Sequence, residues 1–192
     1  MPRRKVDFRA GEFYHVYNRG HNREDIFFER ENYLHFLRKV REHLTHECCE
    51  VIAYCLMPNH YHLLVQLLQP EFSEAMKLLG LSYVKAINKR FDRVGPLFQG
   101  PFAAIHVDEE SYLLHLTRYI HLNPVAAAFV KRPEDWEYSS YREYVGMRNG
   151  TLPSPQVILT QFGSVEGYRR FVESDTGRDD PLISHLIFDE NE

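Results

Sequence analysis

Apolar and polar residues follow two different periods along the chain, and each period predicts one kind of element. Runs of aromatic and β-branched residues with alternating or continuous apolar character predict strands at 13–18, 50–57, 60–66 and 103–107. Apolar residues three or four positions apart predict helices over about 29–46, 73–91 and 108–122. Pro58 and Asn59, between the second and third strands, predict a tight hairpin turn.

The resulting order, β-α-β-β-α-β followed by a helix, is typical of a ferredoxin-like split βαβ fold. This is an α+β class with an antiparallel sheet, helices packed against one face, and the opposite face free to carry a site. Beyond it, the aromatic segment from Trp136 to Val145 indicates one more helix, and a run rich in Gly and Pro predicts a linker. We therefore expect a domain over 1–145, a linker over 146–155 and a small acidic C-terminal helical extension over 156–192.

Composition narrows the class of protein. Hydrophobic residues make up 44% and charged residues 26% of 192 residues, which is ordinary for a globular domain with its own core. Three cysteines with no CxxC pair argue against a disulfide framework or a cysteine-rich zinc site and favour a reducing compartment. No stretch reaches the roughly 18 apolar residues of a spanning helix. The expected location is the cytoplasm, with no membrane partner.

The charge is unevenly distributed, which matters for a nucleic-acid partner. The net charge is −4, but residues 1–150 hold 20 Lys and Arg against 19 Asp and Glu, whereas residues 151–192 hold 3 against 8. Because binding responds to the local field, a near-neutral body can still present a basic groove. The net charge therefore does not exclude nucleic acid.

The sharpest local motif is His60-Tyr61-His62. Residues two apart in a strand project to the same face, so the two imidazoles lie together while Tyr61 faces the core. Paired neutral imidazoles suit a divalent metal, although two surface histidines on a half-exposed strand would give the same pattern.

A second motif lies at the end of the third predicted helix. Tyr119 and Asn123 are four residues apart and share a helical face, so an amide oxygen and a phenol could act together beside a metal. On the spacing alone, a core aromatic at Tyr119 and a helix cap at Asn123 before Pro124 are the simpler explanation. Tyr112 and His115 fall near the same face. The spacing therefore leaves Tyr112 open as the nucleophile and His115 open as a metal ligand or a base.

Four segments in order resemble one family. The segment from Cys55 to Val65 is similar to the metal-binding strand of the HUH single-tyrosine, IS200-like transposases. The segment 117–125 resembles the catalytic helix of their REP-associated tyrosine transposase branch, and the segments 14–20 and 136–141 also resemble that branch. The matches run from about residue 12 to 145, roughly three quarters of the chain.

The resemblance implies a function and a site. It implies a transposase in which His60, His62 and Asn123 hold Mg²⁺ or Mn²⁺ and Tyr119, rather than Tyr112, is the nucleophile. Such an enzyme cuts single-stranded DNA through a 5′-phosphotyrosine and rejoins the strands. Related insertion-sequence enzymes have Gln at the position of Asn123, so its role as a ligand rests on the REP-associated branch.

The implied partner is single-stranded DNA with REP-like hairpins, bound by a monomer rather than a dimer. Candidate DNA-binding residues are the N-terminal basic arm, the arginines after the first strand, the end of the second helix and a neighbour of Tyr119: Arg3, Arg4, Lys5, Arg19, Arg23, Lys85, Lys89, Arg90 and Arg118. A solvated terminus or helix face is the alternative for each cluster.

Three other functions remain possible at this point. One is a non-catalytic protein that binds REP-type hairpins, and another is a metal hydrolase in which Tyr119 is only a hydrogen-bond donor. The third is a replication initiator or relaxase of the wider HUH class, against which the small size and the missing helicase segment argue.

Overall fold

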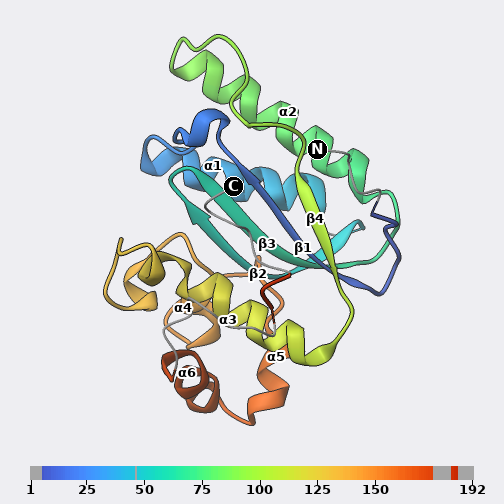
Figure 1. Cartoon of the computed structure of the whole chain (residues 1–192), viewed down its shortest axis with the longest axis vertical. Coiled ribbons are helices and arrows are strands. Elements are labelled where there is room, and N and C mark those ends of the chain that lie inside the picture. Colours follow the sequence, from blue (N-terminus) through green and yellow to red (C-terminus); the bar gives the residue numbers. More distant parts are fainter. Residues whose placement is uncertain (1–5, 46, 175–182, 186–192) are drawn as a thin grey trace.

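The sheet has four strands in the order β2-β3-β1-β4, and every pairing is antiparallel. The computed structural model describes residues 6–45, 47–174 and 183–185. The strands are β1 (Phe13–Arg19), β2 (Cys49–Met57), β3 (His60–Leu67) and β4 (Ala103–Val107). With α1 (Arg30–Leu44) after β1 and α2 (Phe72–Arg90) after β3, this is the split βαβ order, which confirms the predicted ferredoxin-like α+β fold (Figure 1).

Two long helices cover one face of the sheet. α1 presents Tyr33, Phe36 and Val40 at helical spacing, and α2 presents Met76, Leu79 and Tyr83. These side chains are buried against the inward residues of the strands, among them Val16, Tyr61 and Leu63. Tyr83 also donates its hydroxyl proton to the backbone carbonyl of Ile26 (2.7 Å), so the loop before α1 is attached to α2.

The strand register decides which side chains share the other face. Arg19 lies opposite His60 and Tyr17 opposite His62, and opposite residues of an antiparallel pair project to the same side. On β2, Met57 and Cys55 are the partners of the same two histidines. His60 and His62 therefore project together, away from α1 and α2, as the alternation in the sequence predicts.

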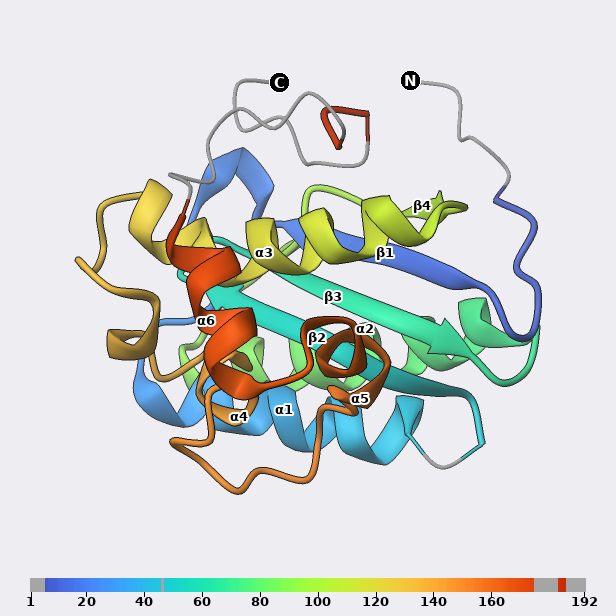
Figure 2. The same ribbon diagram turned by 90° about the horizontal axis from the view of Figure 1, so that it is seen from below.

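This second face is not open, because further helices pack on it. α3 (Glu110–Ala126) crosses it, and the C-terminal α6 (Val165–Glu173) packs beside α3 (Figure 2). The second hydrophobic core joins sheet residues such as Leu64 to Leu116 and Ile120 of α3 and to Tyr168 of α6. The site expected on this face therefore lies between the sheet and α3.

α3 continues past the point at which Asn123 and Pro124 were expected to end or kink it. The helix ends at Ala126, with Pro124 in its last turn. The amide of Ala127 donates to the carbonyl of Asn123 (2.9 Å), so the final turn stays closed although proline lacks an N–H.

The segment 136–145, expected as one helix, is helical only in its second half, and its first half lies along the outer edge of β2 through turns and one bridge between Cys55 and Ser139. Only α4 (Tyr141–Tyr144) is helical in it, after a 3-10 turn, η2 (Pro133–Asp135). The amide of Leu56 donates to the carbonyl of Tyr138 (3.0 Å), and the amide of Ser140 donates to that of Tyr54 (3.0 Å). An edge strand needs such partners to avoid pairing with another chain, and this requirement overrides the helical spacing of the aromatics.

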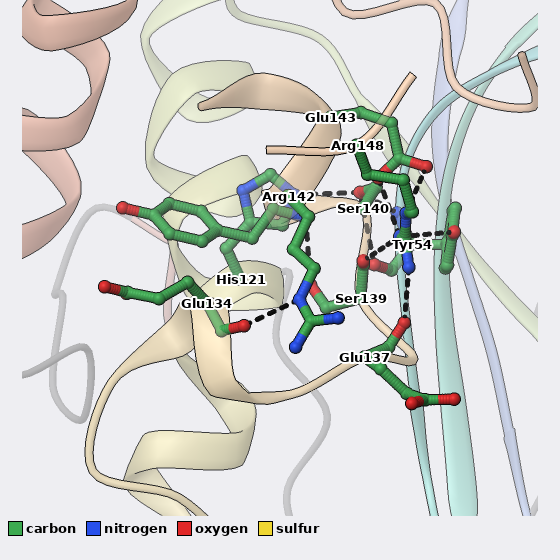
Figure 3. Close-up of polar contacts among 10 residues, drawn as sticks. Tyr54, His121, Glu134, Glu137, Ser139, Ser140, Arg142, Glu143 and Arg148 are labelled. Atoms are coloured by element: carbon green, nitrogen blue, oxygen red, sulfur yellow. Dashed lines mark hydrogen bonds and ion pairs between the residues drawn. The ribbon is translucent and has the colours of Figure 1, made fainter. Parts of the chain in front are cut away.

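A buried polar network holds this segment in place (Figure 3). Arg148 donates to Glu143 Oε2 (2.7 Å), to the carbonyl of Glu137 (2.6 Å) and to the hydroxyl of Tyr54 (3.1 Å). Ser140 Oγ accepts from the amide of Tyr54 (2.9 Å). Fully satisfied networks of this kind fix one arrangement of the chain.

The C-terminal elements share a core with the sheet. In the segment expected as a linker, the amide of Ser154 donates to the carbonyl of Val51 (2.8 Å) and Leu152 is buried. Beyond it, α5 (Gln156–Leu159), η3 (Thr160–Phe162) and α6 bring Ile158 and Tyr168 into the second core. Within residues 6–45, 47–174 and 183–185, no helix is long and apolar enough to cross a membrane.

Candidate active site

Four side chains named from the sequence meet between β3 and α3. Nε2 of His60 lies 3.2 Å from Oδ1 of Asn123. The His62 ring meets His60 edge to face at a centroid distance of 5.0 Å and Tyr119 at 5.5 Å. All four are nearly buried, and Tyr119 keeps 8% of its surface exposed. The two strand residues and the two helix residues therefore form one cluster.

The hydrogen bonds around His60 determine which of its ring nitrogens carries the proton. Asn59 donates its Nδ2 to the carbonyl of Arg23 (3.2 Å), which directs its Oδ1 to Nδ1 of His60 at 2.7 Å. Nδ1 of His60 therefore carries the proton and donates it. In the neutral ring, Nε2 then directs a lone pair at the amide oxygen of Asn123, which is also an acceptor.

Burial keeps both histidines in the neutral form. It lowers the pKa of His60 to about 4. The hydrogen bond with Asn123 raises this pKa by a smaller amount, and the charge of Arg19 lowers it further. It also lowers the pKa of His62 well below the usual value, and the neighbouring histidines add to this. Neutral imidazoles are the form that binds metal ions.

This donor set fits a divalent cation. Two acceptors that face each other repel unless positive charge lies between them, and adjacent ligands of an octahedral cation at about 2.1 Å are roughly 3 Å apart. The 3.2 Å between His60 Nε2 and Asn123 Oδ1 matches that separation. Nitrogen and amide-oxygen donors without thiolate suit magnesium or manganese better than a structural zinc site.

The described residues provide no alternative metal cluster. Over residues 6–45, 47–174 and 183–185, no group of three or more His, Cys, Asp or Glu side chains could hold a metal ion. At the candidate site, the donor that faces His60 is instead an amide oxygen, Oδ1 of Asn123.

Tyr112 and His115, the other candidates on α3, contact different residues. Tyr112, two turns before Tyr119, packs against His185 at a ring distance of 5.1 Å. His115 accepts a hydrogen bond from Arg118 (3.1 Å) and lies against Phe171 of α6 (5.6 Å). The tyrosine that contacts the histidine pair is thus Tyr119. His121, on the same helix, is buried and bonded to Tyr168 and Ser140.

The candidate DNA-binding residues are divided between the two faces. Arg19 lies next to His60 and donates to Gln99 (3.1 Å), and Arg118 stacks over Phe171 at 4.6 Å beside Tyr119. Arg23 is exposed in the loop after β1, and its backbone carbonyl accepts a hydrogen bond from the side chain of Asn59. Lys85, Lys89 and Arg90 are exposed on α2, on the opposite side of the sheet. Arg3, Arg4 and Lys5 lie outside the described residues.

Two residues beside the site were missed by sequence reasoning. Asn59 was assigned only to the turn, and His15 on β1 was not singled out. His15 is fully buried, and its Nε2 lies 3.0 Å from Nδ1 of His62. The signal was present in the alternation of His15, Tyr17 and Arg19 along a strand that the fold places next to β3.

Comparisons with known proteins agree with this description. A model of the family described as "Transposase IS200 like" matches residues 11–123. A curated protein of Haemophilus influenzae, named as a REP-associated tyrosine transposase, is 26% identical over 121 residues, covering 57% of this chain and 69% of the relative.

Solved structures support the fold. A REP-associated tyrosine transposase bound to a REP hairpin superposes with a TM-score of 0.65 at 17% identity and covers 80% of this chain and 98% of its own. A transposase from Deinococcus radiodurans matches only weakly, at a TM-score of 0.41 and 20% identity, over 62% of this chain and 95% of its own. The family model and the curated relative confirm the resemblance inferred from the sequence motifs.

Proposed function

This chain belongs to the IS200-like transposase family, and from that premise we propose that it is a metal-dependent endonuclease and strand transferase for single-stranded DNA. The observation that carries the proposal is the meeting of Tyr119 with His60, His62 and Asn123 in one buried cluster. A phenol beside a preformed metal-binding donor set is the arrangement that nucleophilic attack on a phosphodiester requires.

The metal would be held by His60, His62 and Asn123. Mg²⁺ or Mn²⁺, when bound, supplies positive charge that stabilises the phosphate oxygens in the transition state. The chain provides neutral imidazoles, of which His60 is oriented by the Asn59 side chain, and an amide oxygen fixed on the last turn of α3. The ligands are thus arranged before any ion or DNA arrives.

Tyr119 would act as the nucleophile. Its oxygen attacks the phosphorus in line, the bond to the 3′ oxygen of the upstream strand breaks, and the phenolic proton is lost as that strand leaves with a free 3′-OH. The product is a 5′-phosphotyrosine that conserves the energy of the phosphodiester. Attack by a second 3′-OH restores the tyrosine and joins the strands.

DNA would approach on the side where Arg19 lies opposite His60 in the strand register. This position suits a contact to a phosphate next to the cut. Arg118 is buried against His115 and Phe171 and would contact DNA only after leaving them. The substrate class we propose is single-stranded DNA with a REP-like hairpin, because one structural relative is bound to such a hairpin.

We also infer a monomer in the cytoplasm. The nucleophile and all three metal ligands come from one chain, so no second copy is needed to complete the cluster. Cys48, Cys49 and Cys55 are free, which fits a reducing compartment. Size-exclusion chromatography with light scattering tests the monomer directly, and a dimer mass would contradict it.

Covalent capture tests the enzymatic proposal. The protein is incubated with Mn²⁺ and single-stranded REP-type hairpins from its own genome, and DNA-linked protein is detected on a denaturing gel. We expect a metal-dependent product that Tyr119→Phe abolishes and Tyr112→Phe, the matched control, retains. Hairpin binding without any linked product would favour a non-catalytic binding protein instead. Persistence in Tyr119→Phe would contradict the assigned nucleophile.

A further inference from the structure

His15 lies behind the metal-binding histidines, on the central strand β1. Its side chain is fully buried, and its ring is nearly coplanar with that of His62, with 22° between the planes and 5.2 Å between the centroids. Nε2 of His15 and Nδ1 of His62 are 3.0 Å apart, which is hydrogen-bonding distance. His15 thus contacts His62, a proposed metal ligand, at Nδ1.

A shared proton between two neutral imidazoles fixes the tautomer of each. Each neutral ring has one N–H and one nitrogen lone pair. Across the 3.0 Å contact, one ring must therefore donate its N–H and the other must accept it. If Nδ1 of His62 donates, its Nε2 retains a lone pair for a cation. If Nε2 of His15 donates instead, Nε2 of His62 carries a hydrogen and cannot bind metal.

Hence we propose that His15 is a positioning residue that accepts the Nδ1 proton of His62 and so holds the Nε2 lone pair of His62 ready for a metal ion. This inference rests on the proposed function, because it assumes that His62 is a ligand. Hydrogen-bond partners of this kind orient metal-bound histidines and raise their basicity.

The two proposed histidine ligands would then be oriented by different devices. His60 donates to a side-chain amide that the carbonyl of Arg23 holds in place. His62 has no such turn beside it, since it lies in the middle of β3 between β1 and β2. A side chain from the adjacent strand can supply its acceptor there, and His15 is at hydrogen-bonding distance.

Packing alone does not require a histidine at position 15. Its cross-strand partners on the same face, Leu64 of β3 and Ile105 of β4, are both apolar. An apolar residue at position 15 would fill the same space but would remove the acceptor for a buried N–H, which costs about 1–3 kcal/mol in the folded state. The imidazole therefore has a chemical role toward His62.

The test reads the tautomer directly, without metal or DNA. Long-range proton–nitrogen NMR of histidine-labelled protein distinguishes an Nδ1–H from an Nε2–H ring, and the His62 signal is assigned by its loss in His62→Gln. We expect His62 to be the Nδ1–H tautomer in the wild type and in His15→Gln, whose side-chain oxygen replaces the acceptor. In His15→Leu we expect the Nε2–H form to appear.

Mn²⁺ affinity, measured by calorimetry, gives the second readout. We expect a loss of about 10–100-fold in His15→Leu and recovery to within a few-fold in His15→Gln. His106→Leu is the matched control, because His106 is a part-buried histidine of β4 paired with Glu12 and should change neither readout.

Two results would overturn the inference: an Nε2–H tautomer in the wild type, or an unchanged tautomer together with unchanged affinity in His15→Leu. Should His15→Leu fail to fold, the wild type and His15→Gln still decide, since both must show the Nδ1–H form. Failure of the proposed function looks different, because it would leave the tautomer intact while the wild type forms no DNA-linked product.

Discussion

The buried hydroxyl of Tyr168 connects the C-terminal helix to the centre of the fold, and its removal should destabilise the whole protein. The Tyr168 hydroxyl donates to Nδ1 of His121 (2.6 Å), and Nε2 of His121 donates to Oγ of Ser140 (2.8 Å). Ser140 Oγ in turn donates to the carbonyl of Tyr54 (3.2 Å). The chain of bonds thus joins α6, α3, the 136–145 segment and β2.

Tyr168→Phe keeps the ring and deletes one donor. Both Tyr168 and His121 are fully buried, so Nδ1 of His121 would lose its partner in a place that water does not reach. An unsatisfied buried polar atom costs about 1–3 kcal/mol. For a protein of this size that loss lowers the melting temperature by roughly 2–12 °C.

Urea unfolding followed by circular dichroism measures the change. We expect a lower midpoint with an unchanged slope, because the same surface is exposed when one cooperative unit unfolds. Tyr112→Phe is the control, since Tyr112 is only half-buried and its change should stay within about 0.5 kcal/mol. A loss below that size for Tyr168→Phe, or a separate early transition, would refute the shared core.

Three further predictions concern the turn beside the site, the pH and the metal. Gly20→Ala places a methyl group against the carbonyl of Glu24 and should lower the free energy of unfolding in urea by about 1–3 kcal/mol. Gly80→Ala, in open space on α2, is the control and should raise it by about 0.5–1 kcal/mol. Equal effects of the two substitutions would contradict this prediction. Burial lowers the pKa of His60 to about 4 and that of His121 to about 3, so both contribute stability above their unfolded pKa near 6.5. That stability is lost as pH falls from 6.5 toward 4, at up to about 1.4 kcal/mol per pH unit for each histidine, and a flat urea midpoint between pH 7 and 5 in metal-free protein would argue against it. Mn²⁺ at about 100 times its Kd should stabilise the wild type by about 2.7 kcal/mol in a thermal-shift assay and should not stabilise His60→Ala. An equal shift in both proteins would show that the metal binds at another site.

Much of the fold could be predicted because its signals are local. Period-two alternation places His60 and His62 on one face and Tyr61 on the other, and the register of β3 confirms this. Helical spacing brings Tyr119 and Asn123 together on α3. Both features depend on residues close in the chain.

The rest depends on contacts between distant segments. Aromatics at helical spacing predict one helix over 136–145, but only α4 is helical there, and the residues before it bond to the backbone of Tyr54 and Leu56 at the edge of β2. His15 is separated from His62 by 47 positions, and only the pairing of β1 with β3 brings them together. The cover of α3 and α6 over the second face likewise follows from packing, not from any local pattern.

Mapping the tyrosine that carries DNA tests the central claim most directly. The captured adduct is treated with nuclease and trypsin, and the peptide bearing the residual nucleotide is sequenced by mass spectrometry. Cleavage after Arg93, Arg118 and Lys131 places Tyr112 and Tyr119 on different peptides. The proposed mechanism predicts the nucleotide on the peptide that begins at Tyr119. A nucleotide on the peptide that contains Tyr112, or on neither, would contradict it.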